Sequence, residues 1–368
     1  MRAEDEMSYE RDNIRNMQGY SWGEQPSQQR VIKLNTNENP YPASESVATA
    51  LAQFSVDQLR RYPQPFADPF RDVAAAVHGV KRENIIATNG GDELLRLAIT
   101  TFVGAGETLG MAEPSYSLYP VLAAVQGCNV VKIDLQDDWS LPADFAGQLN
   151  AAGAKLAFVV SPHAPTGQLV PVQHLRTIAQ QFDGVLVIDE AYVDFVDPDL
   201  GYNAVPLIHE LDNVLLLRTL SKGYSLAGLR FAYGIGAASL LAPMLYKTRD
   251  SYNTDAISQS LATAALAARD EAAVSWQRVR EERGRLTAGL TGLGFDVLPS
   301  QSNFVLAAVP GNGEHRAPRL YQGLKDDGIL VRYFDQPRLR DKLRITVGTP
   351  DENDALLCSL RKAMQLND

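Results

Sequence analysis

Cysteine is nearly missing from this chain of 368 residues, which contains only Cys128 and Cys358. Two cysteines exclude a disulfide framework and favour a reducing compartment, so we expect a cytoplasmic protein. Long apolar runs are missing too, since none approaches the roughly 20 residues that a membrane-spanning helix needs. The N-terminus, MRAEDEMSYERDN, does not have the basic-then-apolar layout of a secretion signal. We therefore expect no association with a membrane.

Excess positive charge and metal-binding patterns are also missing. The formal net charge is −10 at pH 7, which argues against general binding to nucleic acid. An anionic ligand would therefore need locally placed arginines and backbone amides. The histidines that could serve as metal ligands lack the required spacing, which predicts no metal site; they are His78, His174, His209 and His315.

What the sequence does contain is an alternation of short apolar segments and helical patterns. Most of the apolar segments could be buried on both faces and are separated by helices, so they predict a mostly parallel seven-stranded sheet in an α/β domain. In such a sheet the ligand site lies at the carboxyl ends of the strands. The predicted strands are 84–90, 107–111, 129–135, 155–161, 184–190, 213–219 and 230–236.

The pattern changes after residue 253. Residues 254–292 have a long helical pattern with one break, and shorter strand and helix patterns follow. The last helix is predicted to start with a capping box, in which Thr349 is the N-cap, Pro350 follows it and Glu352 is three residues on. The expected divisions are a mobile segment at 1–15, an N-terminal arm at 16–43, a large domain at 44–275 and a smaller α+β domain, which the arm completes, at 276–368.

Three short segments carry the chemistry, and they are SPHAPTG at 161–167, VIDEAY at 187–192 and TLSKGYSLAGLR at 219–230. Together they supply an amine from Lys222, a carboxylate from Asp189 at the end of an apolar strand, and a guanidinium from Arg230. These groups suit pyridoxal phosphate: the amine forms an imine with its aldehyde, the carboxylate holds its ring nitrogen and the cation holds its phosphate. The sequence therefore predicts this cofactor.

Each of these residues also has an ordinary interpretation. Lys222 could be a solvated surface lysine, and Asp189 could be a helix cap or a metal ligand. The combination favours the cofactor, because Thr219, Ser221 and Arg230 surround the lysine with groups suited to one phosphate. Burial beside other cations would also lower the pKa of Lys222 and free its amine.

Further candidates lie in two motifs of the same region. In TNGGDE (88–93), Gly90, Gly91 and Asp92 begin a predicted helix whose free N–H groups can bind phosphate, although such a turn is also a common helix start. Tyr116, the last residue of EPSY, is predicted to stack on the cofactor ring, with ordinary packing as the alternative. Tyr192 is predicted to hydrogen-bond the ring's phenolic oxygen, with a half-buried aromatic as the alternative.

Motifs spread along residues 17–365 resemble those of the fold-type I, class II pyridoxal-phosphate-dependent aminotransferases, and most closely the histidinol-phosphate aminotransferases. The segment from Ser221 to Arg230 is highly specific in combination, and the NENP arm favours this subfamily. The motifs are LNTNENPYP (34–42), RRYP (60–63), TNGGDE (88–93), PSYSLY (114–119), PTG (165–167), DEAY (189–192), SKGYSLAGLR (221–230) and LRITVG (343–348).

The resemblance implies a homodimer that transfers an amino group between L-histidinol phosphate and 2-oxoglutarate in histidine biosynthesis. It implies that Lys222 carries the cofactor, that Asp189 holds its ring nitrogen and that Tyr192 holds its ring oxygen. Further cofactor contacts are implied for Gly90, Gly91, Asp92, Tyr116, Thr219, Ser221, Arg230 and, from the neighbouring subunit, Tyr62. Substrate contacts are implied for Tyr20, Asn37, Arg332 and Arg344.

The role implied for Arg344 is chemically reasonable. Histidinol phosphate has no carboxylate, whereas glutamate has one, so a site that serves both in turn needs a cation that accepts either group. A guanidinium can offer a bidentate fork to carboxylate or phosphate. The alternative is a surface salt bridge on an edge strand.

One position departs from the family pattern. Relatives usually have Asn directly before the PTG turn, where its amide donates to the ring oxygen, and this chain has Ala164 there, preceded by His163. We expect His163 or a water to substitute, or Tyr192 to act alone, although His163 could equally be an ordinary turn residue. Loss of a donor predicts a higher pKa for the imine between cofactor and lysine.

Three other functions stay open. Two are enzymatic: an aminotransferase for aromatic amino acids, and a lyase of the threonine-phosphate decarboxylase type. The third is a regulator that binds pyridoxal phosphate without turnover, which is disfavoured because only a short polar segment precedes the arm.

Overall fold

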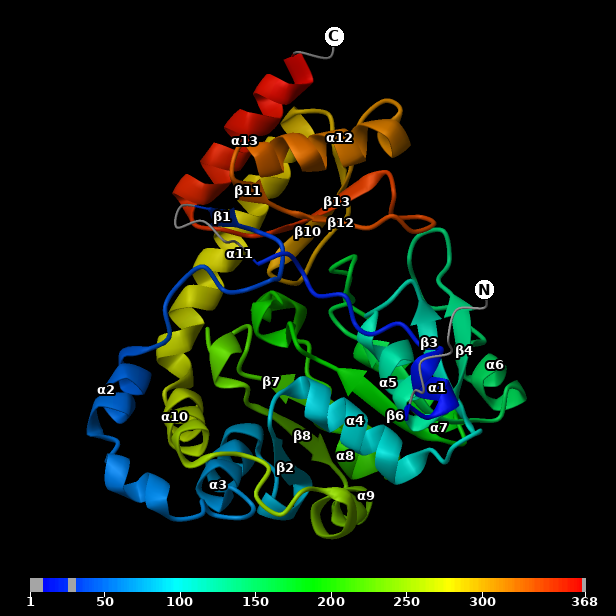
Figure 1. Ribbon diagram of the computed structural model, residues 1–368, viewed down its shortest axis with the longest axis vertical. Coiled ribbons are helices and arrows are strands. Elements are labelled where there is room, and N and C mark those ends of the chain that lie inside the picture. The colour runs from blue at the N-terminus through cyan, green and yellow to red at the C-terminus, as the bar shows by residue number, and fades with distance from the viewer. Residues whose placement is uncertain (1–8, 26–30, 366–368) are drawn as a thin grey trace, which may run out of the picture.

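The computed structural model describes residues 9–25 and 31–365. Figure 1 shows a larger body built around one sheet and a smaller body above it. Helix α11 (Arg269–Gly292) runs from the larger body to the smaller one, and the N-terminal segment passes from one to the other as well.

The larger body contains a seven-stranded sheet in the order β2-β8-β7-β6-β5-β3-β4. The pairs β3-β4, β3-β5, β5-β6 and β6-β7 are parallel, whereas β8 is antiparallel to both β2 and β7. The mostly parallel sheet predicted from the sequence is therefore confirmed. Its strands are β2 (Ile85–Thr88), β3 (Thr108–Glu113), β4 (Asn129–Asp134), β5 (Ala154–Val160), β6 (Val185–Asp189), β7 (Val214–Thr219) and β8 (Ala232–Gly236).

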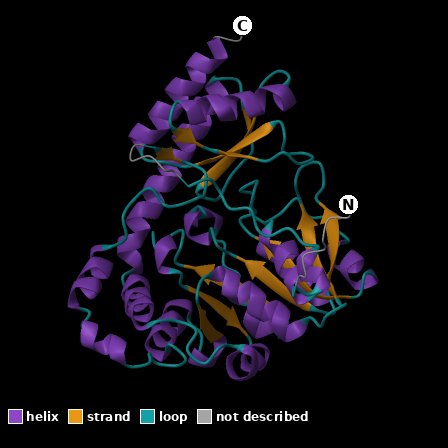
Figure 2. Ribbon diagram, viewed as in Figure 1, coloured by secondary structure: helices purple, strands orange, loops and turns teal. Residues whose placement is uncertain are grey.

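The central strands are apolar on both faces because helices cover both faces. In β7, Val214 and Leu216 belong to one buried cluster, and Leu215 and Leu217 belong to another. Figure 2 shows the helices around these strands. They are α2 (Glu45–Gln53), α3 (Asp68–His78), α4 (Gly91–Phe102), α5 (Leu118–Gln126), α6 (Phe145–Ala151), α7 (Val172–Gln181), α8 (Leu207–Glu210), α9 (Ala238–Pro243) and α10 (Ala256–Ala267).

The smaller body has a four-stranded antiparallel sheet in the order β12-β13-β10-β9. A separate pair joins β1 (Ile32–Lys33) to β11 (Ile329–Leu330) in parallel, so the N-terminal arm supplies a strand to this body. The other elements are β9 (Asp296–Val297), β10 (Phe304–Ala308), α12 (Gly313–Asp326), β12 (Arg332–Tyr333), β13 (Lys342–Thr346) and α13 (Pro350–Gln365).

Two local predictions for this part of the chain are confirmed. The helical pattern breaks at Ala268, which separates α10 from α11. The capping box also forms at the start of α13: the backbone N–H of Thr349 donates to Oε2 of Glu352 at 2.8 Å, and the backbone N–H of Glu352 donates to Oγ1 of Thr349 at 3.4 Å.

The N-terminal segment differs from its expectation. Residues 1–8 lie outside the described residues, but the segment expected to be mobile through residue 15 contains α1 (Asp12–Arg15). Arg11 and Asn13 donate to the carbonyl oxygens of Val125 and Ala124, at 3.0 and 2.8 Å. These carbonyls lie in the last turn of α5, so the two side chains tether the segment to the end of that helix. No helix within residues 9–25 and 31–365 is long and apolar enough to cross a membrane.

Candidate active site

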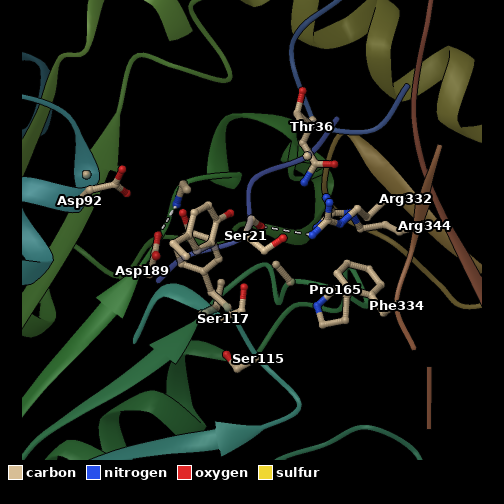
Figure 3. Close-up of a pocket in the computed structure, with 18 of the residues that line it drawn as sticks. Ser21, Thr36, Asp92, Ser115, Ser117, Pro165, Asp189, Arg332, Phe334 and Arg344 are labelled. Carbon is tan, nitrogen blue, oxygen red and sulfur yellow. Dashed lines mark hydrogen bonds between the residues drawn. The ribbon is translucent and has the colours of Figure 1, made fainter. Parts of the chain in front are cut away.

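The carboxyl ends of the parallel strands open into a cavity of about 590 Å³. Its walls include Ala164 after β5, Asp189 at the end of β6 and Lys222 after β7. Parallel strands place these ends on one edge of the sheet, which is where α/β folds bind ligands. Figure 3 shows Arg332 and Arg344 of the smaller body reaching in from the side opposite Asp189.

The amine of Lys222 is held by the N-terminal arm. Its Nζ donates to the backbone oxygen of Thr36 at 2.9 Å. Burial and the positive charge of Arg344 together lower the pKa of Lys222 to about 8, against the opposing effect of Glu38. About a tenth of the amine is therefore unprotonated at pH 7, far more than for a lysine with the ordinary pKa, and a nucleophilic lysine needs this unprotonated form.

The Asp189 carboxylate borders the cavity and accepts two hydrogen bonds. Oδ2 accepts from the hydroxyl of Tyr119 at 2.8 Å, and Oδ1 accepts from the backbone N–H of Ala191 at 3.1 Å. Burial outweighs the opposing effect of these two hydrogen bonds and raises the pKa of Asp189 to about 6. Tyr119 was not among the predicted site residues, because in the sequence it reads as an apolar position at the start of a helix.

An anion site surrounds the start of α4. Gly90 precedes the helix with a φ of 79° and has no side chain, and a Cβ there would lie 2.7 Å from Nη2 of Arg230. The glycine therefore lets the guanidinium lie over the helix start, where it also contacts the Asp92 carboxylate at 3.4 Å. Thr219 and Ser221 add two hydroxyls, 2.9 Å apart. Helix N–H groups, hydroxyls and a guanidinium at one place suit a phosphate group.

Another part of the cavity wall is formed by aromatic residues and the N-terminal arm. The Tyr192 hydroxyl accepts from Nδ2 of Asn37 at 3.0 Å. The Tyr20 ring meets the Tyr116 ring edge-on, with 6.0 Å between centroids and 70° between planes. All four residues border the cavity, so the structure brings the predicted arm residues to the predicted cofactor residues.

Arg344 is a half-buried cation on the cavity wall. Its Nη2 donates to the backbone oxygen of Asn35 at 3.1 Å, but its Nε is buried with no hydrogen-bond partner among the described residues. The guanidinium carbon lies 5.2 and 5.3 Å from the ring centroids of Phe304 and Phe334. Burial lowers the pKa of Arg344, although a guanidinium keeps its charge in proteins. The guanidinium borders the cavity, where it suits an anionic ligand.

Arg332 is the second guanidinium at this wall. It donates weakly to the backbone oxygens of Ser21 and Trp22, both at 3.4 Å, and its guanidinium carbon lies 5.3 Å from the Phe334 ring centroid. Figure 3 shows it beside Arg344. The pair makes this side of the cavity positive although the chain as a whole is acidic.

His163 does not reach this cavity. Its Nδ1 lies 2.8 Å from Oγ1 of Thr166 and its Nε2 lies 3.1 Å from the backbone oxygen of Pro114. Burial lowers the pKa of His163 to about 4, so the ring is neutral and its one N–H points to the carbonyl. Both nitrogens are used to hold the turn, and the predicted cofactor contact of His163 is not supported. Ala164 borders the cavity in its place, without a donor.

Tyr62 lies outside the cavity of its own chain. It is 82% exposed, and its ring stacks on that of Tyr252 with 4.5 Å between centroids. An exposed aromatic stack of this kind can reach a second copy of the chain, but this single chain does not bring Tyr62 to the other site residues.

A loop of the smaller body is fastened to the large sheet next to the cavity. Arg338 donates to the backbone oxygens of Leu135 and Gln136, both at 2.6 Å, and its guanidinium carbon lies 4.2 Å from the Trp139 ring centroid. Phe334 and Leu339, from the same loop, border the cavity. We call this contact the Arg338 latch; the sequence offered no signal for it, since an arginine in a loop has no pattern.

The donor set fits pyridoxal phosphate. The cavity has an amine of lowered pKa for the aldehyde, a buried carboxylate for the ring nitrogen and an anion site at a helix start for the phosphate. The guanidinium of Arg344, which also borders the cavity, remains for a second anion, on a substrate.

Comparisons with known proteins agree with this geometry. Residues 29–360 match the family Aminotransferase class I and II. The chain is 43% identical to Histidinol-phosphate aminotransferase 1 of Trichormus variabilis, over 97% of this chain and 99% of that protein. It is also 43% identical to the histidinol-phosphate aminotransferase of Synechocystis sp., over 95% and 97%.

A solved structure extends the likeness to the fold. The histidinol-phosphate aminotransferase of Sinorhizobium meliloti, in complex with pyridoxal-5'-phosphate, superposes with a TM-score of 0.91 at 24% identity, over the whole of both chains. At that identity the match concerns the fold, whereas the family follows from the closer sequence relatives. The chain belongs to the class I and II aminotransferases, among the histidinol-phosphate aminotransferases.

Proposed function

We propose that this protein is a pyridoxal-phosphate-dependent aminotransferase that exchanges an amino group between L-histidinol phosphate and 2-oxoglutarate, in histidine biosynthesis. Arg344 carries the proposal: its guanidinium, which lies against two aromatic rings, borders the same cavity as the reactive amine of Lys222. An amine with an anion receptor beside it suits an amino-group transfer between small anionic substrates.

The residues of the site and the bound cofactor have different chemical roles. When bound, pyridoxal phosphate supplies an aldehyde that condenses with amines and a ring that withdraws electrons from the carbon next to the nitrogen. Asp189 would hold the ring nitrogen protonated, since its carboxylate is buried and pairs with no cation among the described residues. Lys222 Nζ would take a proton from the substrate carbon that bears the amino group and deliver it to the carbon of the cofactor's former aldehyde, which its pKa of about 8 permits near neutral pH.

Both substrates need the same cation. The phosphate of histidinol phosphate and a carboxylate of glutamate each match the geometry of a guanidinium. Arg344 is assigned to this group, with Arg332 beside it, while Tyr20 and Asn37 close the cavity from the arm. The rings of Phe304 and Phe334 limit the movement of Arg344.

The proposal includes a homodimer. Tyr62 is exposed next to Tyr252, which borders the same surface hollow as Arg230 and Asp92. A partner's tyrosine entering this hollow would come close to the proposed phosphate site. Two unpaired cysteines suit a cytoplasmic location.

The test is an absorption spectrum of the purified holoenzyme during addition of L-histidinol phosphate, with no keto acid present. The expected result is loss of the visible cofactor band at low substrate concentration, and its return on addition of 2-oxoglutarate. Lys222→Ala is the control, because it keeps the cavity but lacks the amine. Bleaching by phenylalanine or tyrosine alone would indicate an aromatic aminotransferase, and release of carbon dioxide from threonine phosphate a lyase. A wild-type protein that forms no band with added cofactor would refute the role of Lys222.

A further inference from the structure

Asn37 is held in an unusual backbone conformation by the smaller body. It has a φ of 58°, in the left-handed region, and is 1% exposed. Its backbone N–H donates to Oγ1 of Thr346 at 3.0 Å, and its backbone oxygen accepts from Nδ2 of Asn303 at 2.9 Å. Two buried partners therefore fix the position of the Asn37 backbone, from which its side chain extends.

The Thr346 hydroxyl then decides which way the Asn37 amide faces. Because this hydroxyl accepts from the backbone N–H of Asn37, its own proton is free to be donated, and Oδ1 of Asn37 lies 3.2 Å away. With Oδ1 turned to Thr346, the NH₂ group of Asn37 faces the Tyr192 hydroxyl at 3.0 Å.

Donor and acceptor roles can be assigned to the Tyr192 hydroxyl in the same way. Its hydroxyl accepts from Asn37, so its single proton is left for another acceptor. Burial raises the pKa of Tyr192, which keeps that proton in place. Tyr192 borders the cavity, as does Ala164, which has no donor, while His163 is occupied in its turn.

We propose that Thr346 is a positioning residue which, through Asn37, directs the proton of Tyr192 toward the phenolic oxygen of the cofactor. This inference rests on the proposed function. Of these neighbouring positions Tyr192 is then the one left to donate, since Ala164 has no donor, and a strand of the smaller body, β13, controls the basicity of the cofactor held by the larger one.

The sign of the effect follows from hydrogen bonding to the charged oxygen. A donor to the phenolic oxygen stabilises its ionised form and lowers the pH at which the visible band of the lysine-bound cofactor titrates. In Thr346→Val the Asn37 amide loses its fixed partner and can turn Oδ1 toward Tyr192, which then donates to Asn37. The midpoint pH of the band should rise by about 0.5 to 1 unit, because one hydrogen bond to a charged group weakens.

The other charges near these groups stay constant across the comparison. Those that face Tyr192 are Arg344 from β13, Asp189 from β6 and Tyr20 from the arm. Those that face Lys222 are Arg344, Glu38, Lys33 and Arg230. A change of the midpoint in a Thr346 variant therefore reports the hydroxyl and its partners.

The experiment is a pH titration of the visible band in reconstituted holoenzymes. Thr346→Val removes the hydroxyl, and Thr346→Ser restores it. Ile345→Val is the matched control for packing, because Ile345 is fully buried on the same strand and points to the opposite face. Tyr192→Phe sets the upper limit, and the double variant Tyr192→Phe with Thr346→Val tests whether the effect passes through Tyr192.

The expected pattern has a raised midpoint in Thr346→Val, wild-type midpoints in Thr346→Ser and Ile345→Val, and no further rise in the double variant over Tyr192→Phe. A wild-type midpoint in Thr346→Val, or a full additional rise in the double variant, would overturn the inference while leaving the proposed function intact. A wild-type protein without a visible band would instead overturn the proposed function.

Discussion

Replacing Tyr119 by Phe should raise the pH below which the apoenzyme loses affinity for the cofactor. The Tyr119 hydroxyl donates to Oδ2 of Asp189 at 2.8 Å, and both residues are buried. Burial raises the pKa of Asp189 to about 6, and the Tyr119 hydrogen bond opposes this rise. A hydrogen bond to a charged group contributes about 1.5 to 3 kcal/mol, so its loss should raise the pKa of Asp189 by about 1 to 2 pH units.

The sign follows from the form of Asp189 that the cofactor needs. An ionised carboxylate pairs with the protonated ring nitrogen, so affinity falls as the pH drops through the pKa of Asp189 in the apoenzyme. For wild type this fall is centred near pH 6. In Tyr119→Phe it moves to or above neutrality, and the affinity at pH 7 should be up to about tenfold weaker.

The assay is titration of apoenzyme with pyridoxal phosphate, followed by quenching of intrinsic fluorescence, from acidic to mildly alkaline pH. The phenylalanine keeps the stack on Phe158, whose ring centroid lies 4.4 Å from that of Tyr119, so packing is preserved. Asp189→Asn gives the reference without a titrating carboxylate. Superimposable curves of affinity against pH for wild type and Tyr119→Phe would refute the reasoning.

Four further outcomes follow from the cavity. Arg344→Gln should lower kcat/KM by about 100-fold or more for both substrates in steady-state assays, because a buried charge contact is lost; a loss for only one substrate would contradict the shared site. Arg338→Ala breaks the latch and should raise KM by about 3- to 10-fold with less effect on kcat; an unchanged KM would show that the latch does not hold the wall. Ala164→Asn should lower the midpoint pH of the visible band, by adding a donor to the ring oxygen; a midpoint equal to wild type would remove this idea. Because burial lowers the pKa of Lys222 to about 8, capture of cofactor by the apoenzyme should speed up with pH around that value, as followed by stopped-flow absorbance, and not around the ordinary 10.5.

Much of the cavity could be predicted because its residues follow strands. The runs that end at Asp189 and Thr219 are apolar enough to be read as buried strands, and parallel strands bring their carboxyl ends together. The positions of Lys222 and Arg230 then follow from their short distance along the chain from β7. The sheet, and the edge of it that carries the site, could therefore be predicted from the sequence alone.

The missed contacts depend on directions that a sequence does not state. Tyr119 and Asp189 are 70 residues apart, and only the packing of α5 on the sheet turns the hydroxyl toward the carboxylate. His163 lies in the expected turn, but the need to satisfy Thr166 and a carbonyl points its ring away from the cavity. A motif places a residue near a site, whereas the partners of its side chain decide whether it faces that site.

The pairing of β1 with β11 has a consequence for the order in which the chain folds during synthesis. All seven strands of the large sheet lie before residue 237, whereas the partner of β1 begins at Ile329. Translation thus delivers a complete large sheet while the arm still has no strand to join. Thr36, whose backbone oxygen accepts from the Lys222 amine, lies just after β1 and cannot take its final position until β11 has been synthesised. The catalytic cavity is therefore one of the last parts of the molecule to form during synthesis. A chain that stopped before residue 329 would have the sheet without a working site.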